Sequence, residues 1–284
     1  MKLLESILRG VGQVMFQNNW VSGLLFLIGI FYNSWLFVLA AIAGTIISTV
    51  SAQMLKYSKE DIKNGLYGFN GALTGIAVMI FFEPNLLSIA ALILGSVLST
   101  VVMNFLKKIS PPFTAPFVLV SWILIYSLVF IFKVPLETAP ASVVDHSFQL
   151  LEASSKSFGQ VMFQDNAVTG FLFLVAILIN SKMAALYAVY AAVLGSLFGW
   201  LFSASFFSIN EGLMGYNAIL CAIALSGTRT KDMIWITFAI ILSTALNIGL
   251  GKTGIITLTA PFVLTTWIVL GLKAIEHRRK KAVN

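Results

Sequence analysis

QVMFQNN, residues Gln13–Asn19, is followed much later in the chain by QVMFQDN, residues Gln160–Asn166, so that six of seven positions are identical. GLYGFN at Gly65–Asn70 likewise returns as GLMGYN at Gly212–Asn217. Both pairs are 147 positions apart. Two polar motifs that recur at one spacing indicate a tandem duplication.

A third motif supports the duplication. TAPFVL at Thr114–Leu119 returns 145 positions later at Thr259–Leu264, and a tryptophan follows each copy, Trp122 and Trp267. In an apolar chain, an internal repeat is typical of a transporter or channel built around a pseudo-two-fold axis.

The composition indicates a membrane protein. The 284 residues are 58% hydrophobic and only 10% charged, and the mean hydropathy is +0.93. Such a chain has too little polar surface to be soluble as a monomer. The net charge of +7 could suggest nucleic-acid binding, but the run His277–Lys281 directly follows the last apolar stretch. Cations placed there anchor membrane orientation and meet anionic lipid. We therefore expect contact with a lipid bilayer and none with nucleic acid.

Apolar stretches predict five spans and one half-length helix in each repeat. In the first repeat they are a short piece near Leu3–Phe16 and spans near Trp20–Asn33, Trp35–Leu55, Leu66–Phe82, Leu86–Leu106 and Phe117–Phe132. In the second they are a short piece up to Phe163 and spans near Val168–Ile179, Ala184–Phe202, Gly212–Leu225, Met233–Leu250 and Pro261–Leu272.

This pattern predicts an all-α integral membrane protein with two repeats. We assign residues 1–135 to the first repeat, 136–157 to a linker outside the cytoplasm, and 158–284 to the second repeat with its basic cytoplasmic tail; the repeats form one membrane domain. Because five is odd, the second repeat must enter the membrane from the opposite side, so the repeats are inverted.

The positive charges support this orientation. With both termini cytoplasmic, only three of the 18 Lys and Arg residues fall outside, namely Lys133, Lys156 and Lys252. The other fifteen fall on the inner side, as the positive-inside rule requires.

Each QVMFQ(N/D)N copy ends a short apolar stretch and opens the next span. In lipid, a broken helix is tolerated only where protein buries it or where it lines a polar cavity. One interpretation is a re-entrant half-helix from which the side-chain oxygens of Gln13 and Gln160 face a pore. The other is that the amides cap helices at the headgroups, which applies more readily to Gln17–Asn19 and Gln164–Asn166.

Aromatic residues recur within the polar motifs. Phe16 precedes Phe69 by 53 residues, and Phe163 precedes Tyr216 by the same number. A membrane phenylalanine usually fills a core or faces lipid. If these pairs instead face one another across a pore, each forms a slot that admits a flat solute and excludes hydrated ions.

Thr114 and Thr259 lie two residues before Pro116 and Pro261, where a missing N–H leaves backbone carbonyls free. Their hydroxyls could line the pore or could bond back to their own helices. No ionisable side chain falls in the middle of a proposed span, and coupled transport usually requires one. No catalytic triad, metal-ligand group or phosphate loop is recognisable, and Cys221 stands alone in an apolar run. We expect no enzyme activity, no metal and no cofactor.

The repeated motifs together resemble those of the urea transporter family, and its bacterial members most closely. The resemblance extends over nearly the whole chain. It implies a homotrimer in the bacterial inner membrane, with one pore per subunit and passive, channel-like passage of urea. Gln13 and Gln160 would supply acceptors to a ladder for the urea amides, Phe16 with Phe69 and Phe163 with Tyr216 would form two slots, and Thr114 and Thr259 would line the middle. Asn70, Asn217, Pro116 and Pro261 would support these residues.

Other classes of transporter are alternatives. A channel for ammonia, water or another small amide is the nearest, although no histidine pair or Asn-Pro-Ala repeat is present. An ion-coupled secondary transporter is less favoured. Tyr216 departs from an apolar slot because its hydroxyl needs a partner.

Overall fold

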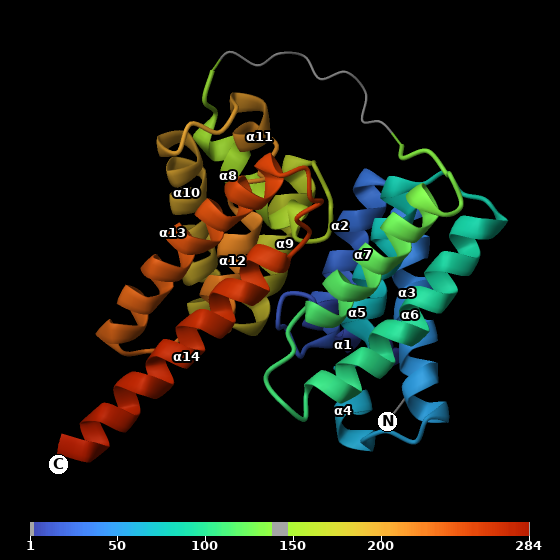
Figure 1. Cartoon of the computed structure of the whole chain (residues 1–284), viewed down its shortest axis with the longest axis horizontal. Coiled ribbons are helices and arrows are strands. Elements are labelled where there is room, and N and C mark those ends of the chain that lie inside the picture. The colour runs from blue at the N-terminus through green and yellow to red at the C-terminus, as the bar shows by residue number, and fades with distance from the viewer. Residues whose placement is uncertain (1–2, 138–146, 284) are drawn as a thin grey trace.

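The computed structural model of the chain describes residues 3–137 and 147–283. Residues 138–146 of the predicted linker, including His146, lie outside the described residues. All regular secondary structure that is described is helical, in fourteen segments (Figure 1).

Seven helices come from each repeat. Those of the first are α1 (Leu3–Gln13), α2 (Trp20–Asn33), α3 (Trp35–Met54), α4 (Lys59–Lys63), α5 (Gly68–Phe81), α6 (Leu86–Leu106) and α7 (Ala115–Phe130). Those of the second are α8 (Leu150–Gln160), α9 (Ala167–Asn180), α10 (Lys182–Leu201), α11 (Phe206–Asn210), α12 (Tyr216–Ala224), α13 (Thr230–Lys252) and α14 (Ala260–Val283).

Six of the seven helices in each repeat correspond to the predicted apolar stretches. The seventh, α4 or α11, has five residues and was not predicted from the sequence. Both begin at a serine cap, in which Ser58 accepts from the Asp61 N–H and Ser205 from the Ser208 N–H. Serine is favoured at this position because its oxygen satisfies an otherwise unpaired N–H.

The long and the short helices have different positions in the protein. Among the described residues, four helices are long and apolar enough to cross a membrane, α3, α6, α10 and α13. In contrast, α5 has 14 residues and α12 has nine, so α5 is roughly 21 Å long against an apolar bilayer core of about 30 Å. All residues of Gly68–Met79 and Tyr216–Ile223 are buried. These two short helices therefore lie inside the protein.

Small residues allow the short helices to approach their neighbours. A Cβ added at Gly44 of α3 would lie 2.1 Å from the Gly71 carbonyl oxygen of α5, and one added at Gly71 would lie 2.0 Å from Ser48 Oγ. Helix pairs in membranes commonly pack through such small side chains because they bring the backbones together.

Contacts between the two repeats are reciprocal. Ser22 Oγ of α2 donates to the Ala176 carbonyl of α9 (2.7 Å), and Thr169 Oγ1 of α9 donates to the Gly29 carbonyl of α2 (2.9 Å). Each residue of the second bond lies 147 positions from its counterpart in the first. Phe26 meets its own counterpart Phe173, with ring centroids 4.8 Å apart. Reciprocal contacts and self-pairs are what a two-fold arrangement produces.

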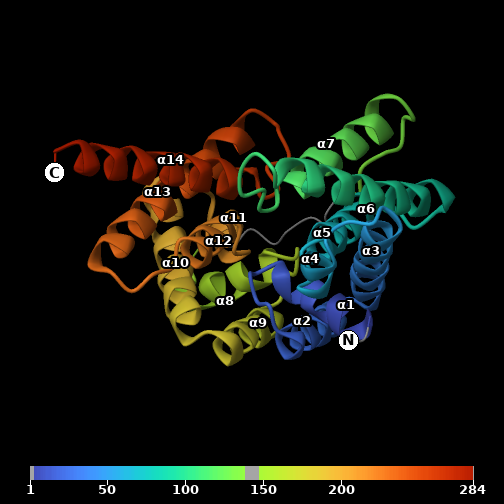
Figure 2. The same cartoon turned by 90° about the horizontal axis from the view of Figure 1, so that it is seen from below.

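The ends of the chain share one side of the molecule. The two repeats lie side by side in both views (Figures 1 and 2). In Figure 1 the described N- and C-terminal ends lie at the lower edge, whereas the chain leaves α7 and enters α8 at the upper edge. The last residues before the undescribed segment and the first after it are thus on the side opposite to the termini.

Candidate functional site

The two copies of QVMFQ(N/D)N end their short helices in the same way. The Phe16 N–H donates to the Gln13 carbonyl (3.0 Å) and the Gln17 N–H to the Gly12 carbonyl (3.0 Å). Phe163 and Gln164 make the equivalent bonds to Gln160 and Gly159. This pair of bonds is a Schellman motif, in which the residue that reverses the chain is usually glycine.

In this protein the reversing residue is phenylalanine in both copies. The backbone φ is +62° at Phe16 and +61° at Phe163. A non-glycine residue in this left-handed region costs on the order of 1–3 kcal/mol, and such strain often marks functional positions. The strain therefore favours a role for both rings that glycine could not fulfil.

Gln13 and Gln160 each present a side-chain oxygen. Their Nε2 groups donate to the carbonyls of Asn64 and Glu211, at 2.9 Å in both copies. Only the amide nitrogen can donate to a carbonyl, so Oε1 must point elsewhere. Within the described part of the chain neither Oε1 accepts a hydrogen bond from protein. Two strong acceptors are thus held in equivalent positions with their accepting atoms free.

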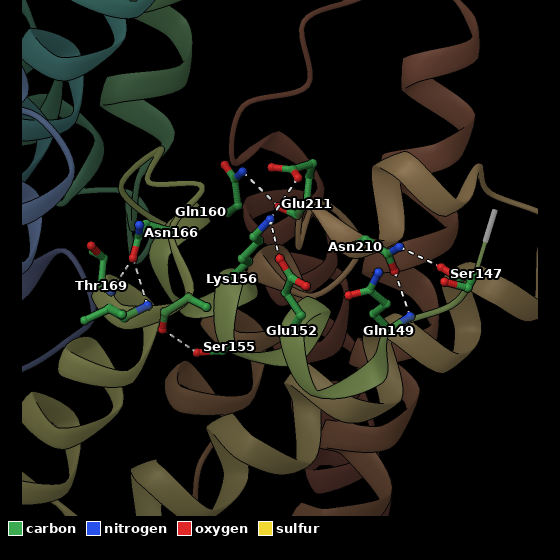
Figure 3. A network of polar contacts seen from close by, with 12 residues as sticks. Ser147, Gln149, Glu152, Ser155, Lys156, Gln160, Asn166, Thr169, Asn210 and Glu211 are labelled. Atoms are coloured by element: carbon green, nitrogen blue, oxygen red, sulfur yellow. Dashed lines mark hydrogen bonds and ion pairs between the residues drawn. The ribbon is translucent and has the colours of Figure 1, made fainter. Parts of the chain in front are cut away.

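An ion-pair network holds the surroundings of Gln160 (Figure 3). Lys156 Nζ contacts Glu152 Oε1 (2.8 Å) and Glu211 Oε1 (2.9 Å). The backbone carbonyl of Glu211 also accepts the hydrogen bond from Gln160 Nε2. The first repeat has a related arrangement, in which Arg9 pairs with Glu5 and donates to Asn18 Oδ1 (2.7 Å). A cation lies one helical turn before the key glutamine in each repeat, a feature that the sequence interpretation missed although the spacing is visible.

Asn70 and Asn217 have a defined supporting role. Asn70 Oδ1 accepts from the Phe117 N–H at the start of α7, and Asn217 Oδ1 accepts from the Phe262 N–H at the start of α14, both at 3.1 Å. These N–H groups have no partner within their own helices because they lie in the first turn. A side chain from a neighbouring buried helix therefore caps α7 and another caps α14.

This capping frees two threonines. Thr114 is the N-cap residue of α7 yet makes no side-chain capping bond, although threonine commonly caps its own helix. Its hydroxyl instead lies 2.7 Å from the hydroxyl of Thr259, and both side chains are buried. Because Thr114 and Thr259 are counterparts, this self-pair places the two helix starts against each other at the boundary between the repeats. The back-bonded alternative does not apply to either residue.

Proline is compatible with both helix starts because no helical hydrogen bond is lost there. Pro116 is the second residue of α7 and Pro261 the second of α14, where the missing N–H would have had no helical partner. Two tryptophans then hold these helices across the boundary. Trp122 Nε1 donates to the Ile256 carbonyl (2.7 Å) and Trp267 Nε1 to the Pro111 carbonyl (2.8 Å).

Aromatic rings gather on both sides of the threonine pair. Phe16 packs edge to face on Phe113 and on Phe262, each with centroids 6.0 Å apart. Phe163 packs in the same manner on Phe117 (6.0 Å) and Phe81 (6.5 Å). Phe262 and Phe117 are counterparts, so each strained ring contacts the first turn of a helix from the other repeat.

A cavity joins four of the predicted residues of the second repeat. It has a volume of about 180 Å³. Its lining includes Gln160, Phe163, Tyr216 and Thr259. In the first repeat Phe69 is buried, and among the described aromatic pairs no ring contact joins Phe69 to Phe16. The structure thus brings the second set together around a space, and it surrounds Phe16 with Phe113 and Phe262, which were not predicted.

The other amides of the two motifs are structural. Gln17 and Gln164 are buried and donate to the carbonyls of Met15 and Met162. Their oxygens accept from the other repeat, Gln17 from Asn180 Nδ2 (2.9 Å) and Gln164 from Asn33 Nδ2 (3.0 Å). A further pair, Asn19 and Asn166, caps α2 and α9.

Comparison with known proteins assigns the chain to a family. The profile described as "Urea transporter" matches residues 4–274, which is almost the whole sequence. The chain belongs to the urea transporter family. Urea transporter 1 of Rattus norvegicus is 30% identical over 266 residues, which cover 87% of this chain and 68% of the relative. Urea transporter 1 of Ovis aries is 30% identical over an alignment of 298 residues, which spans 95% of this chain and 77% of the relative.

Membership in the urea transporter family agrees with the geometry. The protein is an integral membrane protein that transports urea, and its family is one of transporters rather than enzymes. Urea is planar and uncharged and carries four N–H donors. The acceptors at Gln13, Gln160 and the threonine pair, with flat aromatic faces beside them, match that chemistry.

Proposed function

We propose that urea crosses the membrane passively through one pore at the boundary between the repeats. The pore runs from Gln160 through the slot of Phe163 and Tyr216 to the pair Thr259 and Thr114. It continues past Phe16 and Phe69 to Gln13. The observation that supports it best is that Gln160, Phe163, Tyr216 and Thr259 line one cavity, while Thr259 contacts its counterpart Thr114.

The proposed chemistry follows from what urea must lose. Inside a narrow pore its amide groups leave water, and an unpaired polar group in a dry site costs about 1–3 kcal/mol. Free oxygens at both mouths and hydroxyls in the middle replace those bonds in sequence, and aromatic faces contact the flat apolar surface of the solute. Hydrated ions are excluded because the pore offers no charge to replace their water.

Passive transport follows from where the charges lie. Arg9 and Lys156 each lie one helical turn before a key glutamine, and each is paired with a glutamate on its own helix. Among the described residues of α5 and α12, the short buried helices, none is Asp, Glu, Lys, Arg or His. Coupling would require a group that binds the driving ion and shifts a conformational balance.

Transport is therefore expected to run downhill only. Proteoliposomes given an inward sodium or proton gradient should equilibrate urea and then stop. Membrane voltage should not alter the rate, because voltage acts on charge at about 2.3 kcal/mol per unit charge per 100 mV and urea carries none. Tracer urea uptake with and without each gradient measures this, and sustained accumulation above the outside concentration would refute passive transport.

We also propose the remaining organisation. Residues 1–135 and 158–284 would form inverted repeats, with 136–157 as the linker outside the cytoplasm; this linker includes the start of α8, residues 150–157. Three copies would assemble as a homotrimer in the inner membrane of a bacterium, each with its own pore. The positive-inside charge distribution supports cytoplasmic termini, and both ends lie on the same side of the molecule, at the lower edge of Figure 1. The exposed apolar residues, such as Trp35 and Leu86, would face lipid.

This topology predicts a labelling pattern. A cysteine placed at position 146 should react with a membrane-impermeant thiol reagent added outside intact cells, whereas one placed at position 280 should react only after permeabilisation. Cys221 is buried and is replaced by alanine in both variants to remove background. The reverse pattern would show that the termini face outward.

A further inference from the structure

The Tyr216 hydroxyl already occupies an acceptor beside the proposed slot. Tyr216 Oη donates to the Leu258 carbonyl at 2.6 Å. Leu258 has φ of +47° and directly precedes Thr259, so its carbonyl belongs to the turn that opens α14. Both Tyr216 and Leu258 line the 180 Å³ cavity.

The Leu258 carbonyl is free of its own helix for a definite reason. Leu258 lies two residues before the first residue of α14, so its carbonyl is outside the helical hydrogen bonds, and the Phe262 N–H donates to Asn217 Oδ1. Asn217 Nδ2 reaches the Leu258 oxygen only at 3.5 Å. Tyr216 is therefore the close donor to a carbonyl that would otherwise be open to a solute.

The first repeat lacks this contact. Phe69 stands in place of Tyr216 and carries no hydroxyl. Phe113 stands in place of Leu258 and has the same unusual backbone, with φ of +49°. Asn70 Oδ1 accepts the hydrogen bond from the Phe117 N–H in the same way. Among the described residues, no protein group donates to the Phe113 carbonyl. The two slots therefore differ by one occupied acceptor.

Space behind Tyr216 allows its hydroxyl to move. A second cavity of about 430 Å³ lies next to the first, and Leu213, Tyr216 and Thr257 line both. The second cavity is also lined by Ala204 and Met214. Tyr216 thus has open volume on two sides.

The equivalent space in the first repeat is filled. Tyr57 and Tyr67 stand 147 positions before Ala204 and Met214, and their rings pack with centroids 5.4 Å apart. Tyr67 Oη donates to Asn104 Oδ1 (2.9 Å) and accepts from Lys107 Nζ (3.2 Å), and Lys107 pairs with Asp61. Large, tied side chains thus occupy the region where the second repeat has small ones and a cavity.

Two other acceptors are within reach of Tyr216. Asn247 Oδ1 lies 3.4 Å and Thr257 Oγ1 3.3 Å from the hydroxyl. Asn247 is held with its oxygen toward Tyr216 because its Nδ2 donates to the Leu213 carbonyl (2.8 Å). The hydroxyl can change partner with a small movement toward the second cavity.

We infer that Tyr216 is a hydroxyl latch on the slot of the second repeat. When a planar amide such as urea enters, the hydroxyl transfers its hydrogen bond from the Leu258 carbonyl to Asn247 Oδ1, and an N–H of the solute takes the vacated carbonyl. This inference rests on the proposed pore. It makes Tyr216 a specificity-determining residue, because only a solute with a hydrogen-bond donor can replace the hydroxyl on that carbonyl.

Removing the hydroxyl should improve binding. Tyr216→Phe leaves the Leu258 carbonyl without its close donor, so the urea concentration that gives half-maximal flux should fall about fivefold, the effect of roughly one hydrogen bond. A hydroxyl that only fixed the wall of the slot would have the opposite effect, because its loss would loosen the slot and raise this concentration.

The test is a double-mutant cycle on urea uptake by proteoliposomes over a range of urea concentrations. The four proteins are the wild type, Tyr216→Phe, Asn247→Leu and the double variant. Asn247→Leu removes the alternative partner and should raise the half-saturating concentration when Tyr216 is present. When Phe is at position 216, Asn247→Leu should raise the half-saturating concentration less, because the hydroxyl that needs Asn247 is absent. Any effect of losing the Asn247–Leu213 bond is common to both backgrounds and cancels. Equal effects in both backgrounds would overturn the latch.

A reciprocal variant provides a second test. Phe69→Tyr introduces a hydroxyl beside the Phe113 carbonyl, where the space behind is filled, so the half-saturating concentration should rise. An unchanged value would contradict competition between a hydroxyl and the solute. Failure of the wild type to pass urea would instead refute the proposed function, which keeps the two conclusions separate.

Discussion

Replacing Gln13 or Gln160 by leucine is expected to slow urea flux about 30- to 150-fold. Leucine has similar volume but removes the free Oε1, so one urea amide passes that level without an acceptor. A barrier increase of about 2–3 kcal/mol gives that loss of rate. Expression and assembly should be normal because α1 and α8 keep their buried apolar faces. Flux in proteoliposomes, normalised to the amount of inserted protein, measures the effect.

The same substitution elsewhere provides the control. Gln53 is exposed in the last turn of α3, so Gln53→Leu should leave flux unchanged. If both single variants and the Gln13→Leu/Gln160→Leu double variant transport urea at the wild-type rate, the two glutamines lie outside the pathway.

The second large effect is expected at the threonine pair. Thr114→Val leaves the buried Thr259 hydroxyl without a partner, and this should lower the free energy of unfolding by about 1–3 kcal/mol. The Thr114→Val/Thr259→Val double variant removes both groups, so its stability should return toward that of the wild type. Urea flux in the double variant should nevertheless be roughly 5- to 150-fold below that of the wild type, because the middle of the pore has lost its hydroxyls.

Thermal unfolding and flux measured on the same preparations separate these effects. Thr49→Val is the matched control, because Thr49 is buried but its hydroxyl bonds to the Thr45 carbonyl of its own helix (2.7 Å). Its flux should be unaffected. Recovery of both stability and flux in the double variant would show that the threonine pair only joins the repeats.

Two helices could be predicted from the sequence to the residue. The spans Trp20–Asn33 and Leu86–Leu106 coincide with α2 and α6. Each follows an asparagine, Asn19 or Asn85, that caps the helix through its side chain. A local signal of this kind can be read from sequence because the capping residue and the helix are adjacent.

The supporting contacts could not be predicted because they are not local. Asn70 caps α7 from 47 residues away, which leaves no signature beyond the repetition of the motif. The positive φ of Phe16 and Phe113 was also missed, since phenylalanine ordinarily indicates a helix or strand rather than a left-handed turn. The Schellman bonds at Phe16 are visible only once the helix end is known.

The partners of Tyr216 are also distant in the sequence. The sequence showed that a hydroxyl replaces a plain ring in the second copy, and it predicted the need for a partner. It could not supply the identity of that partner, because Leu258 and Asn247 are 42 and 31 residues away.

The reciprocal contacts between α2 and α9, and between each tryptophan and the opposite loop, have a consequence for ancestry. Every partner in one half has a counterpart that makes the same bond in return, as the identical subunits of a symmetric dimer do. A polypeptide of half this length could form the same interface with a second copy of itself, if the two copies were inserted in opposite orientations. After fusion of two such genes, each half could accumulate its own substitutions, as the different residues at the equivalent positions Phe69 and Tyr216 illustrate.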